Sequence, residues 1–567
     1  MKAILTTFIF LLFVVFSMAQ IPLVKKWDKR FGGLGAERTK STPIYTSDGG
    51  YIVCGNSNSS NDGDKSQINW GSQSNIKSDF WIIKIDSMGN KVWDKRYGGT
   101  EVELLDFGIG SKDGSITLIG SSNSPVSGDI ANINWTGSIN DGGLWMIKLD
   151  SVGNKIWDKG YKLGLLDALT AAIATADGGY LISFGSRSGI GGLKTDTCRG
   201  DNDFFIVKLD SLGNKQWDKT YGGIGIDGPL DVIELRDGNF LIGGASSSSV
   251  GADKTDEVVG TLNSLDMWLI KIDDFGNKIW DKEFGGDNQD FITSIHQSID
   301  GNYLLYGTSS STPSGNKLAA TKDTLSFAGD YWIVKVDSSG NKLWDKAFGG
   351  YNIEEDVYGN IVEDFDGGVI MSGFSLSDMG GDKSENNLLP YPNYQIWLIR
   401  IDSAGNKSWD KTMNLNYRFG GYSGYCKMLI AEPGCFLMQT SCNSDIIGDK
   451  SQLCWDTIGP AYEADYWVVK YCDTSIVTNT KKLQHVSLIM QAYPNPFASE
   501  LFVQLSGKPN NVSATYSLLD VSGRLVLPTI ESFATGTKFN TQKLLPGIYF
   551  LHAKTSKEHI VKKFVKF

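Results

Sequence analysis

The chain has 567 residues, a formal net charge of −11, 66 Gly but only 14 Pro, and 11% aromatic residues. This length allows a large core and more than one domain, and the composition favours many short strands joined by tight turns. Because no basic stretch precedes the end of the chain, the acidic balance argues against nucleic acid as a partner.

The first residues have the pattern of a secretory signal peptide. A lysine is followed by an apolar stretch at 3–16, and Ser17-Met18-Ala19 fits a small-x-small cleavage site. We expect residues 1–19 to be removed by cleavage between Ala19 and Gln20. A membrane anchor is the weaker interpretation, because a span needs about 20 apolar residues. The mature chain is therefore expected to have no transmembrane span.

Seven copies of Trp-Asp-Lys indicate a repeat architecture. They begin at Trp27, Trp93, Trp157, Trp217, Trp280, Trp344 and Trp409, in steps of 66, 64, 60, 63, 64 and 65 residues. A second string, an aromatic or apolar residue followed by Trp, occurs six times: five copies precede a Trp-Asp-Lys, and the sixth lies at the end of the repeats. Because a unique active site cannot occur in seven places, we interpret these recurring residues as scaffold.

One unit, residues 91–150, shows the secondary structure expected of each repeat. Its pattern predicts strands at 91–97, 104–110, 115–120 and 144–150, with a long polar loop at 121–143. The apolar residues alternate or form short runs, as in half-buried or buried strands. Four antiparallel strands repeated seven times predict an all-β fold, a seven-bladed β-propeller.

The two ends of the repeat region predict how the ring closes. The first Trp-Asp-Lys strand, residues 24–31, has no preceding partner, and the last aromatic strand, residues 465–471, has no Trp-Asp-Lys strand after it. We expect the N-terminal strand to complete the last four-stranded blade, which removes the exposed edges of an open array. An open solenoid would leave both ends incomplete.

The hairpin Ile-Asp-Ser-x-Gly-Asn-Lys-x-Trp-Asp-Lys resembles the Trp hairpin of quinoprotein-like propellers. It looks closest to the long propeller repeats of secreted proteins from Bacteroidetes, and the resemblance covers residues 24–473. It implies the fold and not the chemistry. No quinone ligand set is present, so no cofactor is carried over.

The C-terminal tail resembles the type A sorting domain of the type IX secretion system. The matching motifs are Tyr493-Pro494-Asn495-Pro496-Phe497, a Leu-Asp-Val-Ser-Gly-Arg string containing Gly523, Pro546-Gly547-Ile-Tyr549, and a basic terminus. The resemblance implies a small Ig-like β-sandwich, a contact with the secretion machinery, passage across the outer membrane and removal of the tail. A plain Ig-like binding domain is the alternative. The expected domains are a propeller at 20–473, a linker at 474–490 and the sorting domain at 491–567.

Two further patterns bear on metal and redox chemistry. Strings such as Gly63-Asp-Lys-Ser66 could offer oxygens to Ca²⁺, but an ordinary turn is the simpler interpretation because no loop of alternating carboxylates appears. We expect no other metal site and no catalytic residues. Seven Cys are present, and five cluster in the last repeat, where one or two disulfides with unassigned pairing are expected among Cys426, Cys435, Cys442, Cys454 and Cys472.

Three Trp lie outside the repeated strings and are the candidate ligand-binding residues. Trp70, Trp135 and Trp455 share a local string and fall in the long loops of the first, second and last blades. Ring closure makes these blades neighbours, so the three could form one aromatic platform for a sugar or a protein. The alternative is that each Trp folds back and fixes its own loop.

These observations predict an exported propeller that acts as a binding or adhesion protein. It would be secreted or held on the outer-membrane surface and reach it through the periplasm, with an extracellular glycan or protein as ligand. The sequence leaves open whether the protein is anchored or released. The alternative is a secreted polysaccharide hydrolase that uses carboxylates on the loops, although no catalytic motif is present.

Overall fold

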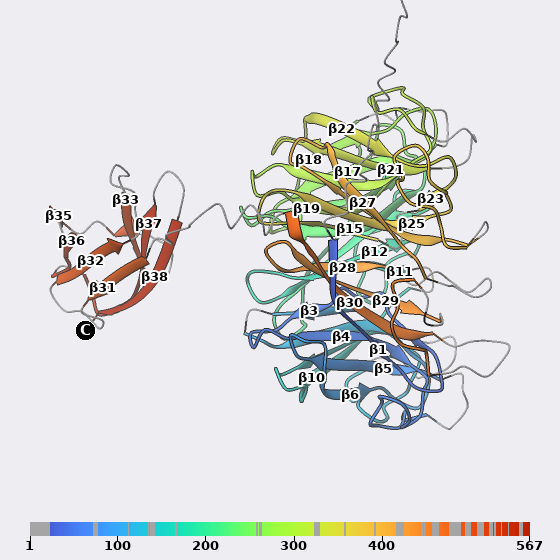
Figure 1. Cartoon of the computed structure of the whole chain (residues 1–567), viewed down its shortest axis with the longest axis horizontal. Coiled ribbons are helices and arrows are strands. Elements are labelled where there is room, and N and C mark those ends of the chain that lie inside the picture. The colour runs from blue at the N-terminus through green and yellow to red at the C-terminus, as the bar shows by residue number, and fades with distance from the viewer. Residues whose placement is uncertain are drawn as a thin grey trace, which may run out of the picture. The chain divides into compact units, whose positions relative to one another are not determined.

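The computed structural model describes two compact units, 1–476 and 477–567 (Figure 1). The described residues are 23–71, 77–111, 113–133, 135, 142–164, 167–256, 259, 264–322, 329–355, 359–389, 393–415, 425–443, 446, 448–455, 464–475, 489–493, 500–506, 515–520, 525–526, 529–533, 536–542, 544–554 and 559–566. The predicted signal peptide and its cleavage site at Ala19 and Gln20 lie outside them. Among the described residues, no helix is long and apolar enough to cross a membrane.

The first unit is a seven-bladed β-propeller, which confirms the predicted fold. Blade 1 contains β2 (Glu37–Arg38), β3 (Ile44–Tyr45), β4 (Tyr51–Ser57), β5 (Asp79–Ile85) and β6 (Lys91–Tyr97). Blade 2 contains β7 (Glu103–Gly110), β8 (Ile116–Ser122), β9 (Gly143–Leu149) and β10 (Lys155–Lys162). Blade 3 contains β11 (Asp167–Ala174), β12 (Tyr180–Ser186), β13 (Asp203–Leu209) and β14 (Lys215–Tyr221).

The other four blades repeat this antiparallel order. Blade 4 contains β15 (Asp227–Glu234), β16 (Phe240–Ser246), β17 (Asp266–Ile272) and β18 (Lys278–Phe284). Blade 5 contains β19 (Asp290–Gln297), β20 (Tyr303–Ser309), β21 (Asp330–Val336) and β22 (Lys342–Phe348). Blade 6 contains β23 (Glu354–Glu355), β24 (Ile361–Glu363), β25 (Val369–Ser375), β26 (Gln395–Ile401) and β27 (Lys407–Met413). Blade 7 contains β28 (Lys427–Glu432), β29 (Cys435–Cys442), β30 (Asp465–Asp473) and β1 (Leu23–Phe31).

The ring closes through the N-terminal strand, as predicted. β1 pairs antiparallel with β30, from Leu23 opposite Asp473 to Phe31 opposite Tyr466. Figure 1 shows the blue β1 beside the orange-brown β30. The first strands of neighbouring blades contact one another, for example β7 with β11 and β11 with β15, so these strands surround the axis and the Trp-Asp-Lys strands lie outermost.

The Trp of each Trp-Asp-Lys links one blade to the next. Trp27 donates its indole N–H to the backbone oxygen of Ser87 in blade 1 at 3.1 Å. Its ring packs on Gly89 of the same turn, where φ is +80°. In the equivalent turns φ lies between +74° and +84°. A side chain at Gly89 would collide with the Trp27 ring, so this position requires glycine for both conformation and space.

The Asp of each Trp-Asp-Lys fixes its own blade. Asp94 accepts hydrogen bonds from the indole N–H of Trp81 at 3.0 Å and from the backbone N–H of Ser66 at 2.9 Å. It also forms an ion pair with Lys91 at 2.9 Å, within the same strand and not across strands. Equivalent ion pairs occur in all seven blades. The conspicuous motif is therefore scaffold.

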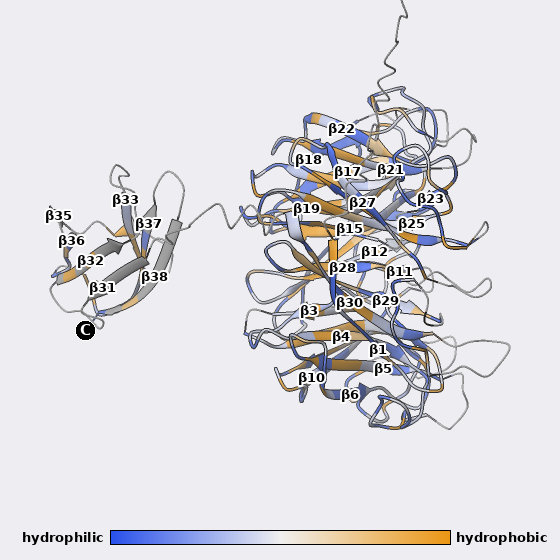
Figure 2. Cartoon of the chain, in the orientation of Figure 1, coloured by the Kyte–Doolittle hydropathy of each residue, from blue (hydrophilic) through white to orange (hydrophobic). Residues whose placement is uncertain are grey.

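The hydrophobic core consists of successive layers between the blades. Each layer joins the second and third strands of adjacent blades, and six of the seven contain a fully buried Trp, such as Trp81, Trp145 or Trp268. The layer between blades 2 and 3 has Phe205 in its place. Figure 2 shows hydrophobic segments along the blade strands and mostly hydrophilic loops. Burial of these large rings on the faces of every blade supplies the main stabilising free energy of the ring.

The described residues of the second unit form two four-stranded antiparallel sheets. One has the order β31 (Ile489–Tyr493), β32 (Glu500–Ser506), β36 (Gly536–Asn540) and β35 (Thr529–Phe533). The other has the order β34 (Leu525–Val526), β33 (Thr515–Asp520), β37 (Gly547–Lys554) and β38 (His559–Lys566). Side chains of both sheets share one core, including Leu501, Phe539, Leu551 and Phe564. An Ig-like topology stays a prediction.

Candidate functional site

The loops that join the second and third strands form what we call the long-loop face. Each carries a turn related to Gly-Asp-Lys, and in blade 1 this turn is Gly63-Asp64-Lys65. Asp64 accepts the backbone N–H of Gly32 at 3.2 Å, and the buried Lys65 ammonium donates to the backbone oxygen of Ser59 at 2.8 Å. The turn therefore holds its own loop and the preceding outer strand together, which is a structural role.

Trp455 is exposed on this face and its orientation is fixed on three sides. Its side chain is 41% exposed, its indole N–H donates to Asp64 at 2.9 Å, and its backbone N–H donates to Asp465 at 2.8 Å. The Arg30 guanidinium lies 4.4 Å from the centre of the ring. Arg30 also lies 3.5 Å from Asp64, so Trp, Arg and Asp form one cluster across the seam of the ring.

Trp70 forms a second copy of this cluster one blade further on. The residue is 48% exposed, and its indole N–H donates to Asp129 at 2.9 Å. Arg96 lies 4.7 Å from the ring centre and 3.0 Å from Asp129. The backbone N–H of Trp70 donates to Asp79 at 2.9 Å, as that of Trp455 does to Asp465. Both Trp rings are thus held by an Arg and an Asp of neighbouring segments.

Trp135 does not join them, so the platform holds two of the three candidate Trp, and the alternative that a Trp folds back on its own loop applies to Trp135. It is only 6% exposed, and its indole N–H donates to the backbone oxygen of Ser124 at 2.9 Å. In blade 2 the residue after Trp-Asp-Lys is Gly160, where Arg30 and Arg96 stand in the other two blades. Trp135 occupies the space above Gly160, because a side chain there would collide with its ring.

The sequence reasoning missed the two Arg residues and their Asp partners. A signal was present, since Trp-Asp-Lys is followed by Arg only at Arg30 and Arg96 among the seven copies. These are the two copies that end the outer strands beneath Trp455 and Trp70. Arg on an aromatic face contributes roughly 0.5–1 kcal/mol when exposed, so each pair rigidifies its Trp without covering the outer side of the ring.

Buried carboxyl pairs at the blade junctions were also missed. Asp79 begins the third strand of blade 1 and Glu103 begins the first strand of blade 2, and both are fully buried. A side chain at Gly98 would meet both carboxyls, and Gly99 donates its N–H to Glu103 at 2.8 Å. Buried acids occupy both equivalent positions at four other junctions: Asp465 and Glu37, Asp203 and Asp227, Asp266 and Asp290, and Asp330 and Glu354.

Burial raises the pKa of several of these carboxyls. Glu354 accepts the N–H of Gly350 and the hydroxyl of Ser375, but burial dominates and raises its pKa from 4.5 to about 7. Burial likewise raises the pKa of Glu37, Asp465, Asp79 and Glu103. A carboxyl with a higher pKa in the folded chain retains a proton that the unfolded chain releases, so its contribution to stability is lost as pH rises.

The melting temperature of the propeller is therefore expected to decrease as the pH rises from about 4.5 to about 7. The shift of Glu354 corresponds to roughly 3 kcal/mol over that range. Glu354→Gln should flatten the pH dependence, since the amide mimics the protonated acid. Gln395 already stands at the position of the buried Asp in blade 6 and accepts the N–H of Leu415 at 2.7 Å. Calorimetry of the parent and of Glu354→Gln at several pH values measures the two melting temperatures. Equal slopes of melting temperature against pH would contradict the prediction.

A pocket of about 570 Å³ lies on the first strands of blades 1 to 3. Ile44, Tyr45, Phe107, Ile109 and Ile173 line much of it, and none of the described residues that line it is acidic. Glycoside hydrolysis needs two carboxyls about 5–10 Å apart that reach the substrate. This pocket supplies none, and the carboxyl pairs at the blade junctions are buried.

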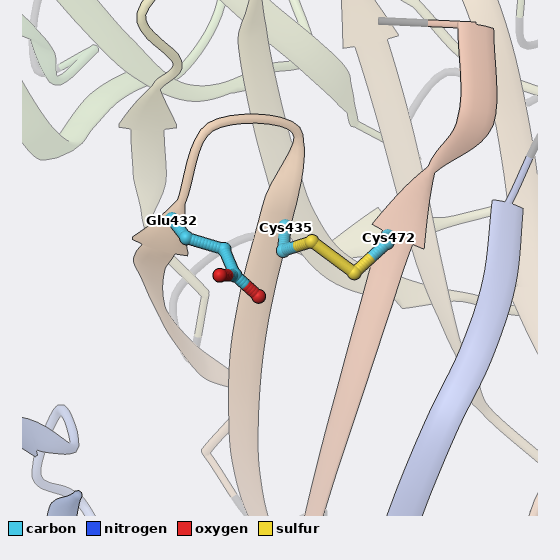
Figure 3. A group of neighbouring side chains, drawn as sticks. All are labelled: Glu432, Cys435 and Cys472. Carbon is cyan, nitrogen blue, oxygen red and sulfur yellow. A yellow bond between two sulfur atoms is a disulfide. The ribbon is translucent and has the colours of Figure 1, made fainter. Parts of the chain in front are cut away.

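Cys435 and Cys472 form a disulfide between facing positions of β29 and β30, with a Cα–Cα distance of 4.0 Å (Figure 3). With Glu432 they are the one group of three potential metal ligands that the described part of the chain brings together. Because both sulfur atoms are bonded to each other, this group is a structural bridge. One of the disulfides expected in the last repeat is thereby assigned.

The sorting-signal residues lie partly in the described second unit. Tyr493 ends β31, Gly547 begins β37, and Pro546 precedes that strand in an exposed position. Tyr549 is buried and donates its hydroxyl to the backbone oxygen of Leu545 at 2.7 Å. Pro494, Asn495, Pro496, Phe497 and Gly523 lie outside the described residues.

Residues 491–566 match the family model described as the secretion system C-terminal sorting domain. The protein is cargo of the type IX secretion system. Its tail engages that machinery, and the protein is delivered to the cell surface or the medium. The propeller is therefore an exported domain of the type found in secreted proteins of Bacteroidetes.

Over most of its length the chain resembles other proteins only at low sequence identity. No curated protein matches it. Similar solved structures include a protein of unknown function from Bacteroides caccae, at 12% identity and a TM-score of 0.31, which covers 59% of this chain and 89% of that one. Another is a protein of unknown function from Dyadobacter fermentans, at 12% identity and a TM-score of 0.36, which covers 65% and 93%. These likenesses carry no argument about activity.

Proposed function

We propose that the protein is an exported binding protein whose long-loop face holds a glycan against Trp70 and Trp455. The observation that carries this proposal is the pair of exposed indole rings, each held by an Arg on its face and an Asp on its N–H. The repeated scaffold Trp of this chain are buried, as Trp81 is, or half-buried, as Trp27 is. Exposed rings forfeit apolar burial that a ligand can restore.

A glycan suits these rings better than a purely apolar ligand. The C–H face of a sugar packs on an indole ring, while its hydroxyls need polar partners. Charged groups surround both rings, with Arg30, Asp64, Arg96 and Asp129 in direct contact. Because these contacts fix each ring before binding, little side-chain entropy is lost when a ligand stacks. A protein ligand remains an outcome of the test below.

A glycan ligand is first selected by screening the mature protein on a glycan array. Trp70→Ala and Trp455→Ala are then expected to weaken binding to that glycan. Each lost ring should cost about 1 kcal/mol, or roughly fivefold in Kd. Stability should change by only about 1 kcal/mol, because each Trp gives up one hydrogen bond and one Arg contact. Titration calorimetry and thermal melts measure the two effects separately.

Trp135→Ala is the matched control. It removes a buried Trp from an equivalent loop and is expected to lower stability by roughly 3–5 kcal/mol, while leaving the affinity of the folded protein unchanged. If the double variant of Trp70 and Trp455 binds the glycan as the parent does, the platform is not the binding site. If only a protein ligand loses affinity, the site is a protein-binding face instead.

A further inference from the structure

Blade 7 carries cysteine at two facing positions, and at the first of them every other blade carries serine. Its second strand ends at Cys442, whereas the second strand of every other blade ends at serine: Ser57, Ser122, Ser186, Ser246, Ser309 and Ser375. Cys442 faces Asp465 across the sheet, as Ser57 faces Asp79. The positions are therefore equivalent in space and not only in sequence.

The second cysteine, Cys454, lies four residues after the buried Lys450 of the long loop. Four residues after the equivalent Lys65, Asn69 donates its side-chain amide to the backbone oxygen of Ser57 at 2.9 Å. Asn387 makes the same contact with Ser375 in blade 6, at 3.2 Å. In blade 7 the sulfur of Cys454 lies 2.9 Å from the backbone oxygen of Cys442. Cys454 thus occupies the place of the asparagine.

Blade 3 shows how close the two side chains come in this arrangement. There the second strand ends at Ser186 and the loop position is Cys198, and the serine oxygen lies 3.8 Å from the cysteine sulfur. Replacing that serine by cysteine, as blade 7 does, brings two sulfur atoms to a similar separation. A disulfide needs about 2 Å between the sulfur atoms, a difference that side-chain rotation can supply.

We propose that Cys442 and Cys454 form a second disulfide in the exported protein. A thiolate of one cysteine attacks an exogenous disulfide, such as oxidised glutathione, and forms a mixed disulfide as one thiol leaves. The second cysteine then displaces the remaining thiol. The two cysteines lose two protons and two electrons, and the oxidant becomes two thiols. This proposal does not depend on the proposed glycan function.

The folding stage and the compartment both bear on this reaction. Burial raises the pKa of the Cys454 thiol to about 12, so the closed loop disfavours the reactive thiolate. Oxidation should therefore occur before the loop packs, during folding in a compartment where disulfides persist. The same blade already contains the Cys435–Cys472 disulfide. The new bridge would join β29 to the residue directly before Trp455 and hold that Trp in register with Arg30.

The test uses the full chain, produced in an oxidising periplasm and denatured in N-ethylmaleimide without reductant. Intact mass should show three alkylated cysteines, Cys54, Cys198 and Cys426, because only Cys435–Cys472 and the proposed pair are protected. Five alkylated cysteines would overturn the proposal. Cys198 is the matched internal control, since it holds the equivalent position opposite a serine and must be alkylated in every sample.

A non-reducing tryptic map then assigns the bond. Cleavage after Lys427, Lys450 and Lys470 separates peptide 428–450, with Cys435 and Cys442, from 451–470, with Cys454, and from the peptide that contains Cys472. All three should run as one species that reductant resolves. In Cys442→Ser and in Cys454→Ser, peptide 451–470 should leave that species and one further cysteine should be alkylated. Attachment of 451–470 to a peptide containing Cys426 would equally overturn the proposed pairing.

Discussion

A chain that lacks residues 23–31 is expected to lose its closed ring and to aggregate. Without β1, the edge of β30 becomes exposed along its whole paired length. Asp28 is lost as well, and with it the hydrogen bonds from the Trp467 indole and the Ser451 backbone, at 3.1 and 2.8 Å. Trp27 no longer covers the first blade. Size-exclusion chromatography with light scattering should show little or no monomer.

Lys26→Ala is the control for this deletion. Lys26 is exposed and is the extra residue of the bulge in β1, so its side chain contributes nothing to the pairing with β30. This variant should remain monomeric and melt as the parent does. A deletion protein that stays monomeric with an unchanged melting temperature would show that the seam is not needed for stability.

Removal of the tail is expected to abolish surface delivery. A chain ending near His485 keeps all seven blades, because the sorting domain belongs to a separate compact unit at 477–567. Its propeller should melt at the same temperature as in the full chain. Since the sorting domain is what the export machinery recognises, we expect nearly all of the truncated protein in the periplasm. Cell fractionation with protease treatment of intact cells measures this.

The reciprocal experiment controls for misfolding of the truncated protein. Residues 477–567 fused to an unrelated periplasmic protein should send that protein to the surface or the medium. Normal surface delivery of the truncated propeller would contradict the assignment of the tail. Loss of delivery together with a lowered melting temperature would instead point to a folding defect.

The fold could be predicted because most strands pair with strands that lie close to them in the sequence. Each Trp-Asp-Lys strand follows its partner strand after a short turn, so an unmatched half at each end implied the pairing of β1 with β30. The contacts between blades were not accessible in this way. Nothing near Trp27 in the sequence indicates that its indole binds Ser87, 60 residues away. The buried acids also recur in the sequence, and Glu103 follows the glycine pair Gly98-Gly99 closely. Only the packing of the blades shows that its carboxyl lies beside that of Asp79.

The candidate site was predictable in position and not in exposure. One sequence pattern shared by three loops identified Trp70, Trp135 and Trp455. Whether each ring is exposed or buried depends on a residue in another strand. Arg30 and Arg96 leave their Trp standing on the surface, whereas Gly160 opens a space that Trp135 fills. Whether the exposed pair binds a ligand remains a prediction.

The seam between β1 and β30 also sets the order in which the ring can be completed. Leu23 pairs with Asp473, so the first strand to be synthesised has to wait for almost the last one. Contacts this distant in sequence raise contact order and slow folding, and an N-terminal strand that emerges early stays unsatisfied while the other blades assemble. Six blades can form from neighbouring hairpins as they appear. The seventh acts as a latch, and until it closes the newly exported chain is at its most vulnerable to proteases and to association with other copies.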